Sequence, residues 1–137
     1  MRNLFFAAVL SFISISALAC SVSVNDNFQK NLLIALGASH LDIPLTKVSA
    51  TTLSGYVKSF EGADPVSECP QHLVTAASIH FKYSPSLYQT CEANVTVNRN
   101  YFIGEIPDGP IEQVNFSGMS ASCSTTIPRI CLPGRRC

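Results

Sequence analysis

The chain has 137 residues and carries nine Lys and Arg against nine Asp and Glu, so its formal net charge at pH 7 is zero. Charged residues make up 13% of the sequence, about half the share found in an average soluble domain. This balance gives no electrostatic argument for nucleic-acid binding, which needs a basic stripe, and we expect no nucleic-acid partner.

Residues 1–19 have the features of a secretory signal peptide. Arg2 precedes an apolar run that starts at Leu4, and the segment closes on the small residues of Ala17-Leu18-Ala19. The apolar run is short for a membrane-spanning helix, which needs about 20 residues, so a retained anchor is the weaker alternative. Cleavage after Ala19 leaves residues 20–137, a length suited to one domain.

The residue after the predicted cleavage site is Cys20, which leaves two possibilities open. Ala17-Leu18-Ala19-Cys20 is similar to a bacterial lipobox, in which the cysteine is acylated. Acylation would leave an odd number of cysteines, whereas all six can pair in an oxidising compartment. The six are Cys20, Cys69, Cys91, Cys123, Cys131 and Cys137. We therefore expect a secreted or periplasmic protein with three disulfides, and keep a lipid-anchored envelope protein as the alternative.

The first element of the mature chain is a predicted helix over residues 26–40. Its apolar stripe is Phe28, Leu32, Ala35, Leu36 and Ser39, with Leu33 at the flank. Asn25 or Asp26 suits the N-cap, Gly37 weakens the far end, and Pro44 prevents continuation. A strand is then expected over residues 48–60, with a bulge or a close approach at Gly55 and a loop over 61–65.

The centre of the chain is a predicted antiparallel hairpin made of residues 73–83 and 87–98. Apolar and polar residues alternate in both segments, and Ser84-Pro85-Ser86 between them is a turn sequence. Folding about Pro85 places Phe81 opposite Gln89 and Ile79 opposite Cys91. We expect Ile79, Phe81, Cys91, Val95 and Val97 to be buried, and His80, Lys82, Glu92 and Asn94 to be exposed.

A second hairpin is predicted from residues 101–106 and 113–116, around the turn sequence Pro107-Asp108-Gly109-Pro110. The predicted fold class is thus α+β, with one N-terminal helix packed on a four- or five-stranded antiparallel sheet. This order resembles the cystatin-like roll in topology, although the Gln-x-Val-x-Gly loop of the inhibitors is missing. The domains are a signal peptide (1–19), an α+β domain (20–122) and a cysteine-rich tail (123–137).

Motifs that carry chemistry are scarce. Cys69 and His72 have a metal-ligand spacing, but zinc sites need a second such pair, so no metal site and no cofactor are expected. On the outer face of the central hairpin the register puts His80 opposite Thr90 and diagonal to Glu92. A carboxylate beside an imidazole suits acid–base chemistry, while an ordinary solvated pair is the plainer interpretation.

The tail offers a second possible contact surface at Arg135 and Arg136. Pro133-Gly134 suits a type II turn, and Cys131 and Cys137 limit the freedom of the chain on both sides of the two arginines. Such a loop can receive an acidic protein or a small anion, or it can be a solvated turn. The sequence therefore predicts a non-enzymatic binding or inhibitory module. The alternatives are a small hydrolase that uses His80 and Glu92, and an envelope protein anchored through Cys20.

Overall fold

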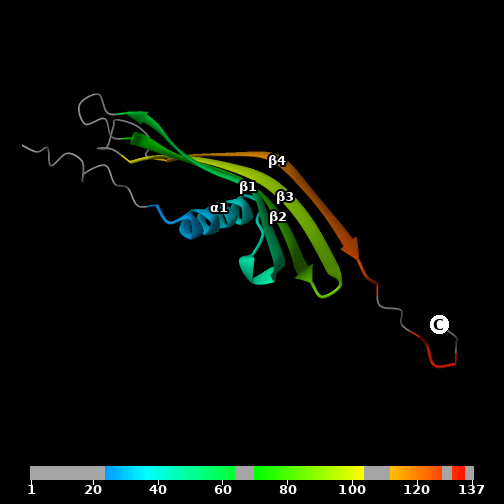
Figure 1. Ribbon diagram of the computed structural model, residues 1–137. Helices are drawn as coiled ribbons and strands as arrows, with labels where there is room; N and C mark the ends of the chain where they lie inside the picture. Colours follow the sequence, from blue (N-terminus) through cyan, green and yellow to red (C-terminus); the bar gives the residue numbers. More distant parts are fainter. Residues whose placement is uncertain (1–23, 64–69, 104–111, 128–130, 135–137) are drawn as a thin grey trace, which may run out of the picture.

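The fold is one helix on one face of a four-stranded antiparallel sheet (Figure 1). This computed structural model describes residues 24–63, 70–103, 112–127 and 131–134. The elements are α1 (Asp26–His40), the short 3-10 helix η2 (Leu45–Lys47), β1 (Val48–Ala63), β2 (Pro70–Ser86), β3 (Gln89–Phe102) and β4 (Glu112–Thr125). The strands lie in the order β1-β2-β3-β4, each antiparallel to its neighbour. The predicted helix and antiparallel sheet are confirmed.

The bounds predicted for α1 are correct, but its predicted buried face is wrong. Asn25 is the N-cap, and its Oδ1 accepts hydrogen bonds from the backbone N–H groups of Asn27 (2.9 Å) and Phe28 (3.2 Å). Phe28 is 62% exposed. The buried positions of α1 are Gln29, Leu33, Gly37 and Ala38.

Gly37 explains why a different face of the helix is buried. A Cβ atom at Gly37 would lie 3.0 Å from Cγ1 of Val95 and 3.3 Å from Cδ1 of Ile79. The glycine is therefore a point of close approach between the helix backbone and β2 and β3. An apolar sequence pattern is built from apolar side chains. Glycine has no side chain, so the pattern does not reveal that it packs against the sheet.

The central hairpin has the predicted faces but a different register. Tyr83 pairs with Cys91 and Phe81 with Ala93, so each residue of β2 faces a partner four positions away from the predicted one. The turn falls at Leu87 and Tyr88, and Leu87 is exposed instead of lying on the buried face. Because the shift is an even number of residues, the same side chains point to the buried face as predicted.

The burial predictions for the central hairpin are otherwise confirmed. The five side chains predicted to be buried are 0–1% exposed, and they are Ile79, Phe81, Cys91, Val95 and Val97. Lys82, Glu92 and Asn94 are exposed, whereas His80 is half-buried.

The flanking strands are longer than predicted. Residues 61–63 belong to β1 and not to a loop, and Tyr101 and Phe102 continue β3 instead of starting a separate strand. Gly55 has a φ of +62° and lies where the β1–β2 register shifts, which confirms the predicted bulge. The predicted turn over 107–110 lies outside the described residues.

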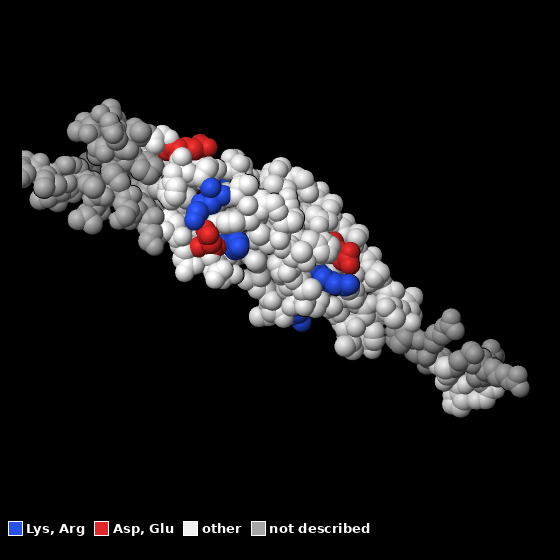
Figure 2. Space-filling model, in the orientation of Figure 1, with Lys and Arg blue, Asp and Glu red and all other residues white. Residues whose placement is uncertain are grey.

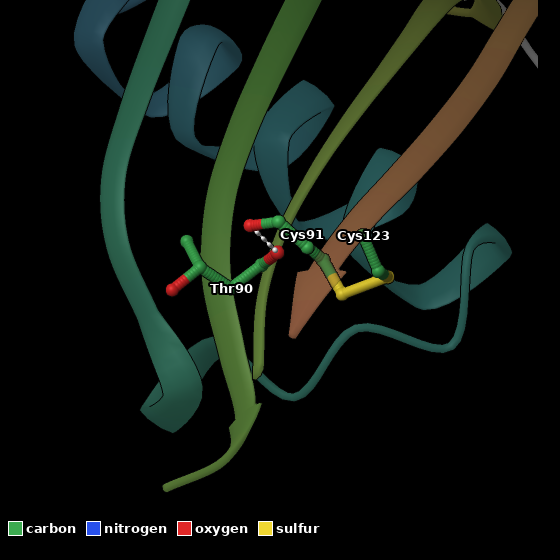
Figure 3. The surroundings of a disulfide bond; sticks show 4 residues. Thr90, Cys91 and Cys123 are labelled. Atoms are coloured by element: carbon green, nitrogen blue, oxygen red, sulfur yellow. Dashed lines mark hydrogen bonds between the residues drawn. A yellow bond between two sulfur atoms is a disulfide. The ribbon is translucent and has the colours of Figure 1, made fainter. Parts of the chain in front are cut away.

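A disulfide joins β3 to β4. Cys91 and Cys123 are direct partners in the antiparallel register, and Figure 3 shows their bond bridging the two strands beside Thr90. The carbonyl of Thr90 accepts a hydrogen bond from Oγ of Ser124 (3.4 Å). Cys131 is also disulfide-bonded, while Cys20, Cys69 and Cys137 lie outside the described residues.

The Cys91–Cys123 bond suggests a non-cytoplasmic location, because cytosolic reductants keep most thiols reduced. Within the part of the chain that the structure describes, no helix is both long and apolar enough to cross a membrane.

We expect a leucine at position 37 to destabilise the fold by about 1 to 3 kcal/mol, because it would overpack the contact between α1 and the sheet. Leucine is a better helix former than glycine, so helix propensity alone predicts the opposite sign. Urea unfolding of Gly37→Leu measures the effect. Ala35→Leu, on the exposed face of the same helix, is the matched control and should change stability by less than about 0.5 kcal/mol. Equal stability of the two variants would contradict the close contact.

Removal of the Cys91–Cys123 bond should also lower stability. The bond closes a loop with a sequence separation of 32 residues, for which a loss of about 2 to 4 kcal/mol is expected. The Cys91→Ala, Cys123→Ala double variant tests this by denaturant unfolding without reductant. An unchanged midpoint would show that the bond contributes nothing to the folded state.

Candidate functional site

An apolar cavity lies between the first turns of α1 and the sheet. Its volume is about 340 Å³. Figure 1 shows the N-terminal end of α1 beside the end of the sheet where β2 begins and β3 ends. The lining residues are Val24, Phe28, Gln29 and Leu32 from the helical side, Leu73, Arg99 and Tyr101 from the sheet, and Ile103 directly after β3. Six of these eight are apolar or aromatic, as is usual in small-molecule sites.

Arg99 is the charged side chain in this lining, and the whole residue is 7% exposed. Its Nη1 donates a hydrogen bond to Oε1 of Gln29 (3.2 Å), and its Nε donates to Oε1 of Glu112. The guanidinium carbon lies 4.7 Å from the ring centroid of Tyr101. Because a buried guanidinium is costly without partners, these three contacts account for its position in an apolar wall.

A buried hydroxyl lies next to Arg99 in the sheet. Thr75 is the register partner of Arg99, is 0% exposed, and its Oγ1 has no hydrogen-bond partner among the described residues. Buried polar side chains are normally satisfied, so this row of the inner face has spare hydrogen-bonding capacity.

Beside the cavity, an ion pair ties the first turn of α1 to β1. Nζ of Lys58 lies 2.6 Å from Oδ1 of Asp26, and the hydroxyl of Tyr56 donates to the same oxygen (3.2 Å). The hydrogen bond from Lys58 lowers the pKa of Asp26 below its ordinary value, although partial desolvation acts in the other direction. Burial, with the negative charge of Asp26, raises the pKa of Tyr56.

The outer face of the sheet gives His80 and Glu92 different partners from those predicted. His80 faces Asn94 instead of Thr90, and its Nδ1 lies 2.8 Å from Oδ1 of Asn94. Glu92 faces Lys82, whose Nζ is 3.5 Å from Oε1 of the glutamate. The predicted placement of His80 was wrong because it depended on a turn at Pro85.

Around His80 the outer face forms a shallow depression of about 200 Å³. Its lining is Ser54, Ser78, Ile79, His80, Asn94, Val95, Thr96 and Gly118. Its polar side chains have protein partners: Oγ of Ser78 lies 3.0 Å from Oγ1 of Thr96, and Nδ2 of Asn94 donates to Oγ of Ser120 outside the lining (3.1 Å). This depression has no charged lining residue to attract a ligand.

The remaining predicted residues fall at the ends of the described chain. Arg135 and Arg136 lie outside the described residues, but Gly134 has a φ of +90°, as the second central position of a type II turn requires. His72 bonds to Asn100, with Nδ1 3.1 Å from Oδ1. Over the described ranges no group of three His, Cys, Asp or Glu side chains could hold a metal ion.

Charged side chains on the face shown in Figure 2 are few and scattered, some with blue and red adjoining, and most of that face is uncharged. No protein-family model, no curated protein and no solved structure matches this chain. The function must therefore be argued from its own residues.

Sequence reasoning missed the cavity, although one signal was available. The inward positions of β3 are odd-numbered, and continuing that series past Val97 places Arg99 inside. An arginine on the buried side of an alternating strand marks a site that needs a partner. Its partners are Gln29 and Glu112. No sequence pattern connects these two residues to Arg99.

The ion pair at Asp26 should make the fold less stable in acid. A lowered pKa in the folded state gives a stabilisation that is present above the unfolded-state pKa of Asp26 and is lost as the pH falls through the folded-state pKa. We expect Asp26→Asn and Lys58→Met each to weaken the fall in urea midpoint between about pH 6 and about pH 2. An Asp26→Asn variant that retains the full pH dependence would contradict this role.

Proposed function

We propose that this protein is an exported, non-enzymatic binding module that holds a small, largely apolar ligand in the cavity between α1 and the sheet. The observation that carries the proposal is the apolar lining of about 340 Å³ around one buried cation. Concave, mostly apolar sites with a few placed polar groups are the usual form of ligand pockets.

The exposure of Phe28 supports this proposal. It lines the cavity and yet is 62% exposed, so a ligand in the cavity would cover apolar surface that now faces water. Burial of a phenylalanine side chain is worth about 1.5 to 3 kcal/mol.

The chemistry of the lining favours binding over catalysis. The eight lining residues include no Ser, Cys, His, Asp or Glu, the side chains that usually serve as nucleophile or general base. The disulfide supports export to the periplasm or the outside of the cell. The helix-then-sheet order supports a cystatin-like roll, used here for a small ligand and not for the inhibition of a protease.

Titration with N-phenylnaphthylamine, an uncharged dye that fluoresces in apolar surroundings, tests the proposal on the exported protein. We expect a saturable increase with one site per chain. Phe28→Glu should weaken binding about tenfold or more, because it places a charge at the edge of an apolar cavity. Leu45→Glu is the matched control, since Leu45 is 52% exposed on η2 and does not line the cavity. Absence of saturation, or equal loss in both variants, would refute the proposed site.

A further inference from the structure

We infer that the cavity takes a medium-chain carboxylate whose anionic group binds the guanidinium of Arg99. This inference rests on the proposed function and adds the chemical class of the ligand. It depends on three properties of the site: the unused donors of Arg99, the asymmetric exposure of its ion pair with Glu112, and the volume of the cavity.

Arg99 has hydrogen-bonding capacity left over. A guanidinium carries five N–H donors in a planar fork. Within the described residues two of its nitrogens have hydrogen-bond partners, with Nη1 on Gln29 and Nε on Glu112. Nη2 has none there. Arg99 also lines the cavity, so a ligand group in the cavity can accept from the remaining donors.

The charge of the wall selects an anion. Oε1 of Gln29 already accepts from Arg99, so the polar end of the cavity presents donors on a permanent cation. Guanidinium groups bind carboxylates with two parallel hydrogen bonds, which neutral alcohols cannot match. An ammonium group has no acceptor for these donors.

Glu112 acts as an internal competitor for that ligand. In the ion pair the side chain of Arg99 is 8% exposed and that of Glu112 is 41% exposed. The cation is therefore part of the wall, whereas its carboxylate partner lies at the solvent edge on the first residue of β4. A bound carboxylate would sit near Glu112 and share the same guanidinium, so the negative charge of Glu112 weakens its binding.

The volume of the cavity is compatible with a medium-chain ligand. At about 30 Å³ for each non-hydrogen group, a cavity of this size holds roughly eleven such groups. Octanoate has ten non-hydrogen atoms, eight carbons and two oxygens. It can place its carboxylate at Arg99 and its chain along Leu73, Leu32 and Phe28, which belong to the apolar lining.

Calorimetric titration of the exported protein with octanoate, octanol and octylammonium separates this inference from the proposed function. We expect octanoate to bind about tenfold or more tightly than octanol, because hydrogen bonds to charged groups contribute more than neutral ones. Octylammonium should bind more weakly than both. Equal affinity for octanoate and octanol would overturn the inference and leave the proposed cavity intact, whereas no binding of any of the three would overturn both.

Glu112→Gln supplies the second test, which does not require Arg99 to be changed. The variant keeps an oxygen that can accept from Nε of Arg99 but removes the competing charge. We expect its affinity for octanoate to rise about tenfold and its affinity for octanol to stay the same. Glu61→Gln, an exposed glutamate on β1, is the matched control and should bind octanoate as the wild type does. Weaker or unchanged octanoate binding by Glu112→Gln would show that the two carboxylates do not share the guanidinium.

Discussion

The contact between Gly37 and the centre of the sheet decides how α1 lies on the strands. With no side chain at this position, the helix backbone can approach Val95 and Ile79 until almost no space remains. Two turns earlier, the same face of the helix carries Gln29, a long side chain that reaches Arg99. The helix is thus close to the sheet at one end and held by long side chains at the other, which is where the cavity lies.

Much of the fold follows from local chemistry and is therefore predictable from sequence. The capping side chain of Asn25 and the residues after it give the bounds of α1 correctly. The alternation of β2 and β3 gives the buried set correctly even though the register was wrong, because an even shift keeps every side chain on its face. Pro85 indicated a turn, but the chain continues to pair as far as Ser86 with Gln89. A proline at the end of a strand is tolerated where its missing N–H is not needed.

The site was less predictable because its contacts join distant parts of the chain. Gln29 and Arg99 are 70 residues apart, and Arg99 and Glu112 are 13 residues apart on the neighbouring strands β3 and β4. Side-chain chemistry suggested that His80 and Glu92 act together. In the fold His80 contacts Asn94, and Glu92 contacts Lys82. A charged residue that breaks an apolar series was the better indicator, because burial of a charge needs a specific compensation.

The position of the Cys91–Cys123 bond has a mechanical consequence. It joins the edge strand β4 to β3 two residues before β4 ends at Thr125. A force applied to the chain after β4 would otherwise peel the edge strand away one hydrogen bond at a time, which is the weakest direction in which to load a sheet. The covalent bond stops such peeling at Cys123, so a force on the chain after β4 passes into β3 before it reaches the rows of β4 that hold Glu112 near Arg99.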